Sequence, residues 1–229
     1  MCASVFKAIS NQFGMTDEQA MWRVQGEDDA AAFARLVERW EKPIQNLGAR
    51  MTGEAHRGED LAQETFARVY ARRKEYQPNG KFSTWLWRIA LNLCYDELRR
   101  MRRRSESSLD DEAGEGRAML ETIASGEAAA AERLEAQERI DEVKMALQQL
   151  GEPYRAVLVL RHYENLKFRE IAEVLEIPEG TVKSRMAEAL SQLGEILKRQ
   201  VVFAPCIVPP GKNEPADLWR VKSGLLERI

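Results

Sequence analysis

Apolar residues recur every three or four positions along most of the chain, the spacing that places side chains on one face of an α-helix. Ala32, Leu36 and Trp40 show this spacing near the start. Leu61 and Phe66 belong to a second such stretch between residues 60 and 70, which leaves Gln63, Glu64 and Arg68 on the opposite side. No segment shows the strict alternation that is typical of a half-buried strand. The pattern therefore predicts an all-α fold.

A turn and a long helix follow. The residues YQPNG at 76–80 contain a proline and an Asn-Gly pair, both of which favour a turn. Ser83 and Thr84 can cap the next helix, whose inner face is predicted to be Leu86, Ile89, Ala90 and Leu93. A second stripe on this helix is aromatic, basic and polar: Trp85, Arg88, Asn92, Asp96 and Arg99. Core packing with solvated charges and contact with nucleic acid both explain this stripe, and the spacing alone leaves both open.

The second half of the chain predicts further helices. One helical face runs through Ile140, Val143, Leu147 and Leu150, and Gly151-Glu152-Pro153 restarts the chain into a largely buried helix. Ile171, Ala172 and Leu175 then form the inner side of a short helix, residues 176–180 turn the chain, and Thr181 begins another helix with Val182 inward. This spacing predicts a helix-turn-helix, preceded by Asn165 in a left-handed turn conformation. An ordinary helical hairpin is the alternative.

Composition and charge narrow the class of protein. The 229 residues carry 34 basic and 37 acidic side chains, a net charge of −3, with 44% hydrophobic residues, which is typical of a globular protein. We see no apolar run long enough to span a membrane, so we expect no membrane insertion, and no secretory signal. Three scattered cysteines and two histidines predict neither a disulfide framework nor a metal site, and they favour a reducing cytoplasm.

Charge is unevenly distributed along the chain. Residues 105–135 hold nine acidic and two basic side chains with few large apolar residues, which predicts a flexible acidic linker. We therefore expect two small helical domains, 15–104 and 136–200, and an extension at 201–229 without an assigned role. Five arginines between 99 and 104 precede the linker. They suit either phosphate binding or the solvated end of a helix.

Three motifs in this order resemble a known family. The segments DLAQETF, FSTWLWRIALNLCYDELRR and YRAVLVLRHYENLKFREIAEVLEIPEGTVKSR are similar to those of bacterial extracytoplasmic-function (ECF) sigma factors, over residues 15 to 198. The resemblance implies a sigma subunit that binds core RNA polymerase, directs it to promoter DNA and promotes strand opening. It implies no catalytic residue and no cofactor, so the chain is expected not to be an enzyme.

The resemblance also implies roles for individual residues. The segment that docks on the clamp helices of the polymerase's largest subunit matches Asp60, Leu61, Gln63, Glu64 and Phe66, of which Leu61 and Phe66 are expected in the core. Minus-ten binding and melting is implied for Asn79, Lys81, Phe82, Trp85, Arg88, Asn92, Arg99 and Arg100. Here Trp85 would act as a wedge, and the loop from Gln77 to Lys81 would receive a flipped base. Minus-thirty-five binding is implied for Thr181, Lys183, Ser184 and Arg185.

One departure from the family leaves alternatives open. Glu188, Ala189 and Leu190 stand where the family usually continues the recognition helix with basic residues, which predicts weak minus-thirty-five binding. This weakness favours one alternative, a protein that sequesters polymerase without sigma activity. A helix-turn-helix regulator that uses only the C-terminal motif is the other alternative, and it predicts a receiver or sensor sequence in residues 1–104, which is not visible. The sequence leaves open the promoter sequence, the inducing signal, the existence of an anti-sigma factor and whether Met1 or Met15 is the true start.

Overall fold

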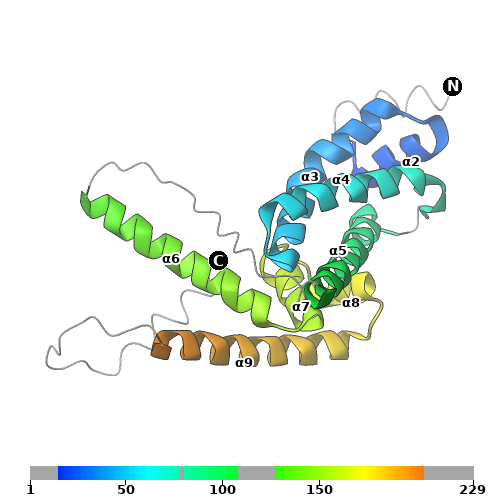
Figure 1. Cartoon of the computed structure of the whole chain (residues 1–229). Helices are drawn as coiled ribbons and strands as arrows, with labels where there is room; N and C mark the ends of the chain where they lie inside the picture. Colours follow the sequence, from blue (N-terminus) through cyan, green and yellow to red (C-terminus); the bar gives the residue numbers. More distant parts are fainter. Residues whose placement is uncertain (1–14, 78–79, 108–126, 204–229) are drawn as a thin grey trace, which may run out of the picture. The chain divides into compact units, whose positions relative to one another are not determined.

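The computed structural model describes residues 15–77, 80–107 and 127–203. Every regular element in these ranges is a helix, which confirms the predicted all-α class. Figure 1 colours the helices α2 to α5 from blue to green and α6 to α9 from light green to orange. The chain divides into two compact units. The first contains α2 to α5 together with Ala172–Pro178, and the second contains α6, α7 and α9. Within the described ranges no helix has both the length and the apolar character needed to cross a membrane.

The first unit begins with α2 (Asp17–Glu27), a helix that the hydrophobic pattern did not single out. Thr16 caps it by accepting a hydrogen bond from the Gln19 N–H, and the Gln19 side chain accepts one from the Thr16 N–H. This reciprocal pair is a capping box, which satisfies two backbone donors at the helix start. The helix ends at Asp28 in the left-handed conformation, and the Asp29 carboxylate then caps α3 (Ala30–Thr52).

Two glycines let α3 and α4 (Ala55–Ala71) pack side by side at very short range (Figure 1). A Cβ atom on Gly58 would lie 2.4 Å from the Gln45 carbonyl oxygen and 2.9 Å from the Ala49 nitrogen, both backbone atoms of α3. A Cβ atom on Gly48 would in turn lie 2.9 Å from the Gly58 Cα. The two helix backbones therefore touch where neither helix has a side chain, and this contact fixes the position of α4.

The long helix α5 (Phe82–Ser107) follows the short 3-10 helix η1 (Arg73–Glu75) and packs against α2, α3 and α4. The predicted inner face is confirmed, because Leu86, Ile89, Ala90 and Leu93 are all buried. Four further residues of α5 are also buried: Phe82, Trp87, Leu91 and Cys94. A helix surrounded by three others buries more of its circumference than a surface helix does. Burial raises the pKa of the Cys94 thiol to about 12, so this thiol stays protonated.

The second unit is built from α6 (Glu127–Gln149), α7 (Glu152–His162) and α9 (Glu179–Phe203). Its core is a cluster of apolar side chains: Ala146, Leu147, Leu150, Leu158, Ala189 and Leu193. The α7 segment is buried as predicted, and it includes Arg155, whose guanidinium donates to the backbone oxygens of Gln148 and Leu150. Ile140 departs from its predicted inward position and is 47% exposed. The helix α6 also begins at Glu127, inside the segment predicted to be linker.

The predicted helix-turn-helix consists of α8 (Phe168–Leu175), a short turn and α9. Asn165 has a φ of 54°, so the predicted left-handed turn before the motif is confirmed. Glu176 adopts a φ of 55°, and the Ile177 N–H donates to the Ala172 carbonyl as the chain leaves α8. Ile171 and Val182 are buried as predicted, whereas Val174 takes the inward position that was expected for Leu175.

Candidate functional site

The exposed face of α4 carries polar side chains beside a buried apolar face. Gln63 and Glu64 are exposed, as is Asp60, whereas Leu61 and Phe66 are buried. Leu61 and Phe66 therefore belong to the core, and any partner that docks on α4 meets the polar residues. A Glu64–Arg68 ion pair of 2.9 Å lies along the same exposed side and orients the Glu64 carboxylate.

An aromatic cluster lies where the chain enters α5. The ring centroid of Trp85 is 5.4 Å from that of Tyr76 and 6.3 Å from that of Phe82. Phe82 and Tyr76 are buried, and Trp85 is half-buried at the edge of the cluster. Phe82 has no exposed surface, so any role of this residue in DNA binding is indirect, through the position of Trp85. The partly exposed Trp85 ring offers a flat apolar surface of the kind on which a nucleobase stacks.

The loop between η1 and α5 is closed by a partly buried hydrogen bond. The Tyr76 hydroxyl donates to the Gly80 carbonyl oxygen at 2.8 Å, and the Gly80 N–H donates to the Gln77 carbonyl at 3.1 Å. Burial, with a smaller contribution from the charges of Glu18 and Asp17, raises the pKa of Tyr76 to about 12. The phenol therefore keeps its proton and remains a donor. Lys81 is exposed beside this loop, and Asn79, a predicted DNA-binding residue, lies outside the described residues.

Helix α2 holds this loop from outside, which the sequence reasoning missed. The Glu18 carboxylate accepts a hydrogen bond of 3.2 Å from the Phe82 N–H. The Gln25 side-chain amide donates to the carbonyl oxygens of Lys74 and Tyr76, at 3.2 and 3.0 Å. The Thr16-x-x-Gln19 capping pattern was the sequence signal that could have located α2. These contacts themselves join residues 49 to 64 positions apart, so no local pattern reveals them.

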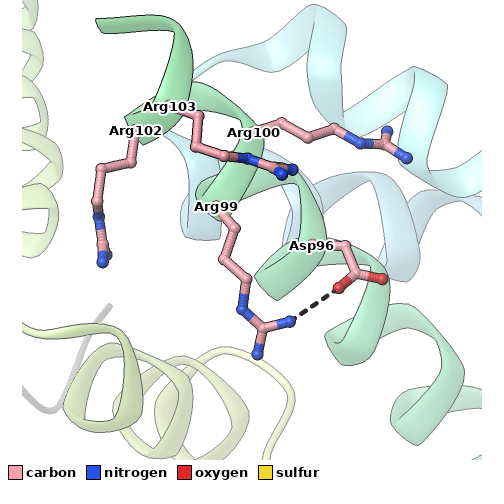
Figure 2. Close-up of a pocket in the computed structure, with 5 residues that line it drawn as sticks. All are labelled: Asp96, Arg99, Arg100, Arg102 and Arg103. Carbon is pink, nitrogen blue, oxygen red and sulfur yellow. Dashed lines mark hydrogen bonds and ion pairs between the residues drawn. The ribbon is translucent and has the colours of Figure 1, made fainter. Parts of the chain in front are cut away.

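Arginines gather at the C-terminal end of α5. Figure 2 shows the side chains that line a hollow there: Asp96, Arg99, Arg100, Arg102 and Arg103. Arg99 forms an ion pair of 3.0 Å with Asp96, drawn as a dashed line in Figure 2. Four arginines and one aspartate line the hollow, which gives it a net positive charge that attracts anionic groups such as phosphates. On the earlier turns of α5, Arg88 is partly exposed and Asn92 is exposed.

An ion-pair network joins this basic end to the start of α4. The Arg57 guanidinium contacts Glu54 and Glu97 at 2.6 Å each, and Glu97 also pairs with Arg100 at 3.4 Å. The hydrogen bond to Glu54, together with the charges of Glu54 and Glu97, raises the pKa of Arg57. Glu97 is only 14% exposed and lies between two cations. The network therefore fixes α5 against α4 next to the arginine hollow.

The start of α9 exposes the predicted recognition residues. Lys183 and Ser184 are exposed, and Thr181 and Arg185 are partly exposed. Lys183 forms an ion pair of 2.7 Å with Glu179, and the Ser184 hydroxyl donates to the Thr181 carbonyl. One turn further on, the exposed Glu188 accepts a hydrogen bond from Gln192. Donors and acceptors at a helix start suit contacts to phosphates and base edges, whereas Glu188 opposes an anionic ligand.

The described surfaces carry several features suited to binding a partner. The arrangement offers an aromatic edge, a basic hollow and two polar helix faces. Among residues 15–77, 80–107 and 127–203 no group of three or more histidine, cysteine, aspartate or glutamate side chains is arranged to hold a metal ion.

Comparisons with known proteins match both halves of the chain. Residues 36–104 match the family description Sigma-70 region 2, and residues 140–193 match Sigma-70, region 4. The ECF RNA polymerase sigma factor SigW of Bacillus subtilis is 36% identical over 74% of this chain and 91% of its own length. The RNA polymerase sigma-H factor of Pseudomonas aeruginosa is 35% identical over 80% of this chain and 94% of its own length.

Two solved structures share the fold. CnrH in complex with the cytosolic domain of CnrY superposes with a TM-score of 0.58 at 23% identity, covering 80% of this chain and 97% of the other. The sigma factor RpoE in complex with the anti-sigma factor NepR, from Bartonella quintana, gives a TM-score of 0.56 at 20% identity, covering 72% and 96%.

Proposed function

The chain belongs to the extracytoplasmic-function sigma factors of the sigma-70 family, and from this membership we propose which of its surfaces performs each step of initiation. A sigma factor binds core RNA polymerase, directs it to promoters and promotes strand opening, and it acts as an initiation factor rather than as an enzyme. The observation that carries this function is the occurrence of both sigma regions, in order, on separate helical segments. A helix-turn-helix regulator or a sequestering protein is not favoured, because neither requires region 2 together with region 4.

The general test is promoter-dependent transcription. Core polymerase with this protein is expected to transcribe a pool of genomic promoter fragments selectively, whereas core polymerase alone is not. A protein that binds core polymerase but supports no selective transcription would instead be a sequestering factor. By analogy with the complexes of the two structural relatives, we also propose that an anti-sigma protein binds this chain.

The exposed face of α4 is the proposed polymerase-docking surface. Its support is the exposure of Gln63 and Glu64 beside buried Leu61 and Phe66, which places polar side chains where the clamp helices can meet them. We expect the double variant Gln63→Ala, Glu64→Ala to bind core polymerase about tenfold more weakly, because two interfacial polar contacts are lost. Competition with a labelled sigma factor for core polymerase measures this.

A matched control comes from the second unit. Gln137 and Glu142 are exposed on α6, and their double alanine variant removes the same side-chain types. We expect that variant to compete as well as the parent protein. Undiminished competition by a folded Gln63→Ala, Glu64→Ala protein would contradict docking through this face.

The start of α5 is the proposed surface for minus-ten recognition and melting. The half-buried Trp85 would stack at the edge of the opened duplex, with Lys81, Arg88 and Asn92 beside it. Arg99, Arg100 and the arginines that follow would hold phosphates at the other end of the helix. Asp60 and Asn79 keep the roles that family membership implies, at the docking face and in the loop respectively.

The start of α9 is the proposed minus-thirty-five surface, with Glu188 as an unfavourable neighbour. Replacing Glu188 with arginine is expected to raise the affinity for duplex DNA several-fold, whatever the DNA sequence, because a phosphate-facing cation replaces an anion. The slope of log affinity against log salt concentration should steepen by the equivalent of about one phosphate contact. Lys183→Ala should shift both quantities in the opposite direction. Fluorescence anisotropy of the full chain with duplex DNA, at several salt concentrations, measures them.

The same change of charge on α6 controls for net charge. Glu142→Arg alters the total charge equally, and Glu142 is an exposed residue of α6 rather than of the recognition helix α9. If Glu142→Arg raises affinity as much as Glu188→Arg does, the gain reflects net charge, and the Glu188 side of α9 does not face DNA.

A further inference from the structure

Two residues of α2 share a face that points at one loop. Glu18 and Gln25 are seven residues apart, two helical turns, so their side chains leave α2 on the same side. Both bind backbone atoms of residues 74–77 and 80–82, which form the loop frame. Glu18 accepts from the Phe82 N–H, and Gln25 donates to the Lys74 and Tyr76 carbonyls. The two side chains therefore hold the loop frame at its beginning and at its end.

We propose that Glu18 and Gln25 are positioning residues for minus-ten base selection: they hold the loop frame in the shape that selects the base extruded from the promoter. This inference rests on the proposed function, in which the loop before α5 receives that base. Neither residue needs to touch DNA. Their effect is transmitted through the backbone atoms of Lys74, Tyr76 and Phe82.

The contacts with α2 add to hydrogen bonds within the loop frame itself. Its internal hydrogen bonds include the Tyr76 hydroxyl to the Gly80 carbonyl and the Gly80 N–H to the Gln77 carbonyl. A pocket that distinguishes bases must hold its groups within about half an ångström of their productive positions. Residues 76–77 and 80–81 of the loop frame lie outside regular structure, so support from rigid elements around them helps to hold them in place. Helix α2, capped at its start by Thr16 and Gln19, is such an element.

Glu18 has a second consequence for the first turn of α5. The Phe82 N–H is one of the first N–H groups of a helix, which have no partner within the helix itself. A carboxylate is a favourable acceptor there, because it also interacts with the positive end of the helix dipole. Trp85 lies in the same first turn, and its N–H donates to the Lys81 carbonyl. Glu18 thus fixes the turn that carries Trp85 as well as the end of the loop frame.

A purely structural role for α2 is the competing explanation, and the variants are chosen to separate the two. Gln25→Met keeps the length and the unbranched shape of the side chain but removes both hydrogen bonds to the loop frame. Glu18→Ala removes the acceptor, whereas Glu18→Gln restores a carbonyl oxygen that can accept from the Phe82 N–H. Glu27→Ala is the matched control, because Glu27 is an exposed carboxylate at the other end of the same helix.

The experiment uses full-length protein with core polymerase and a promoter template pool randomised at the minus-ten positions. Sequencing the transcripts gives, for each position, the preference for the best base over the others. We expect Gln25→Met and Glu18→Ala to reduce the strongest preference about tenfold, the size expected when one or two hydrogen bonds are lost. Glu18→Gln and Glu27→Ala should keep it within about twofold. All four variants should compete for core polymerase as well as the parent protein does.

Each outcome has a distinct meaning. If Gln25→Met and Glu18→Ala lower transcription equally for all templates while the preference is unchanged, α2 is only structural and the inference is overturned. If one of these variants does not fold, the other decides. A parent protein that shows no base preference would overturn the proposed role of the loop and the inference with it. A parent preference that Lys81→Ala alters but the α2 variants do not would overturn only the inference.

Discussion

Replacing Gly58 with alanine will destabilise the first unit by about 3 kcal/mol, at the upper end of the usual cost of overpacking. The new methyl group would lie 2.4 Å from the Gln45 carbonyl oxygen and 2.9 Å from the Ala49 nitrogen. Both are backbone atoms of α3, so no side-chain rotation relieves the clash, and α4 must move away. Urea unfolding followed by tryptophan fluorescence measures the loss, because Trp22, Trp40, Trp85 and Trp87 all lie in the first unit.

Gly26→Ala is the matched control, because nothing lies within 4 Å of a Cβ atom placed on this helical glycine of α2. Alanine is the better helix former, so this variant should gain a few tenths of a kcal/mol up to about 1 kcal/mol. Equal unfolding midpoints for Gly58→Ala and the parent protein would show that α3 and α4 do not touch as described. The Gly58→Ala protein should also bind core polymerase poorly, since its docking face moves with α4.

Removing two arginines from the basic hollow will weaken binding to single-stranded DNA by about 60-fold at roughly 50 mM salt. Each phosphate contact contributes about 0.7 to the slope of log affinity against log salt, so Arg102→Ala with Arg103→Ala should lower the slope by about 1.4. At about 0.2 M salt the same slope change leaves roughly a ninefold loss. Anisotropy titrations of the full chain with a labelled oligonucleotide, at several salt concentrations, give both quantities.

Arg35→Ala with Lys42→Ala provides a control of equal charge, because both residues are exposed on α3, away from the hollow. That double variant should change the slope by much less than 1.4. If the two double variants behave alike, affinity follows the net charge of the protein. The end of α5 would then have no particular role in holding the strand.

Local periodicity was sufficient to predict the faces of single helices. The division of α4 into buried Leu61 and Phe66 and exposed Gln63 and Glu64 follows from helical spacing alone, as does the inner face of α5. The burial of Trp87 was not predicted, because it depends on how many helices surround α5. Periodicity describes one buried stripe, whereas a central helix has contacts on several sides.

Contacts between distant parts of the chain had no counterpart in the pattern. The Gln25 hydrogen bonds connect α2 to the loop frame, and the Arg57–Glu97 ion pair connects α4 to α5. The residues next to Gln25 and Arg57 in the sequence give no sign of these distant partners. Ile140 shows the opposite error: its spacing fits the buried face of α6, but it is 47% exposed in the folded chain. The helical spacing of apolar residues along α6 continues past the part of the helix that other helices of the second unit cover.

Helix α5 is continuous, so it fixes the distance and the relative direction of the side chains at its two ends. Trp85 and Arg103 are eighteen residues apart, five full turns, so both leave the helix on the same side, about 27 Å apart. Duplex DNA lying along the helix would pass about eight base pairs over that length, at 3.4 Å per step. One residue inserted between them would increase their separation by only about 1.5 Å but rotate one end of the helix relative to the other by about 100°. An insertion of seven residues would return Trp85 and Arg103 to the same side of the helix, and it would shift the arginines along the DNA by about three base pairs.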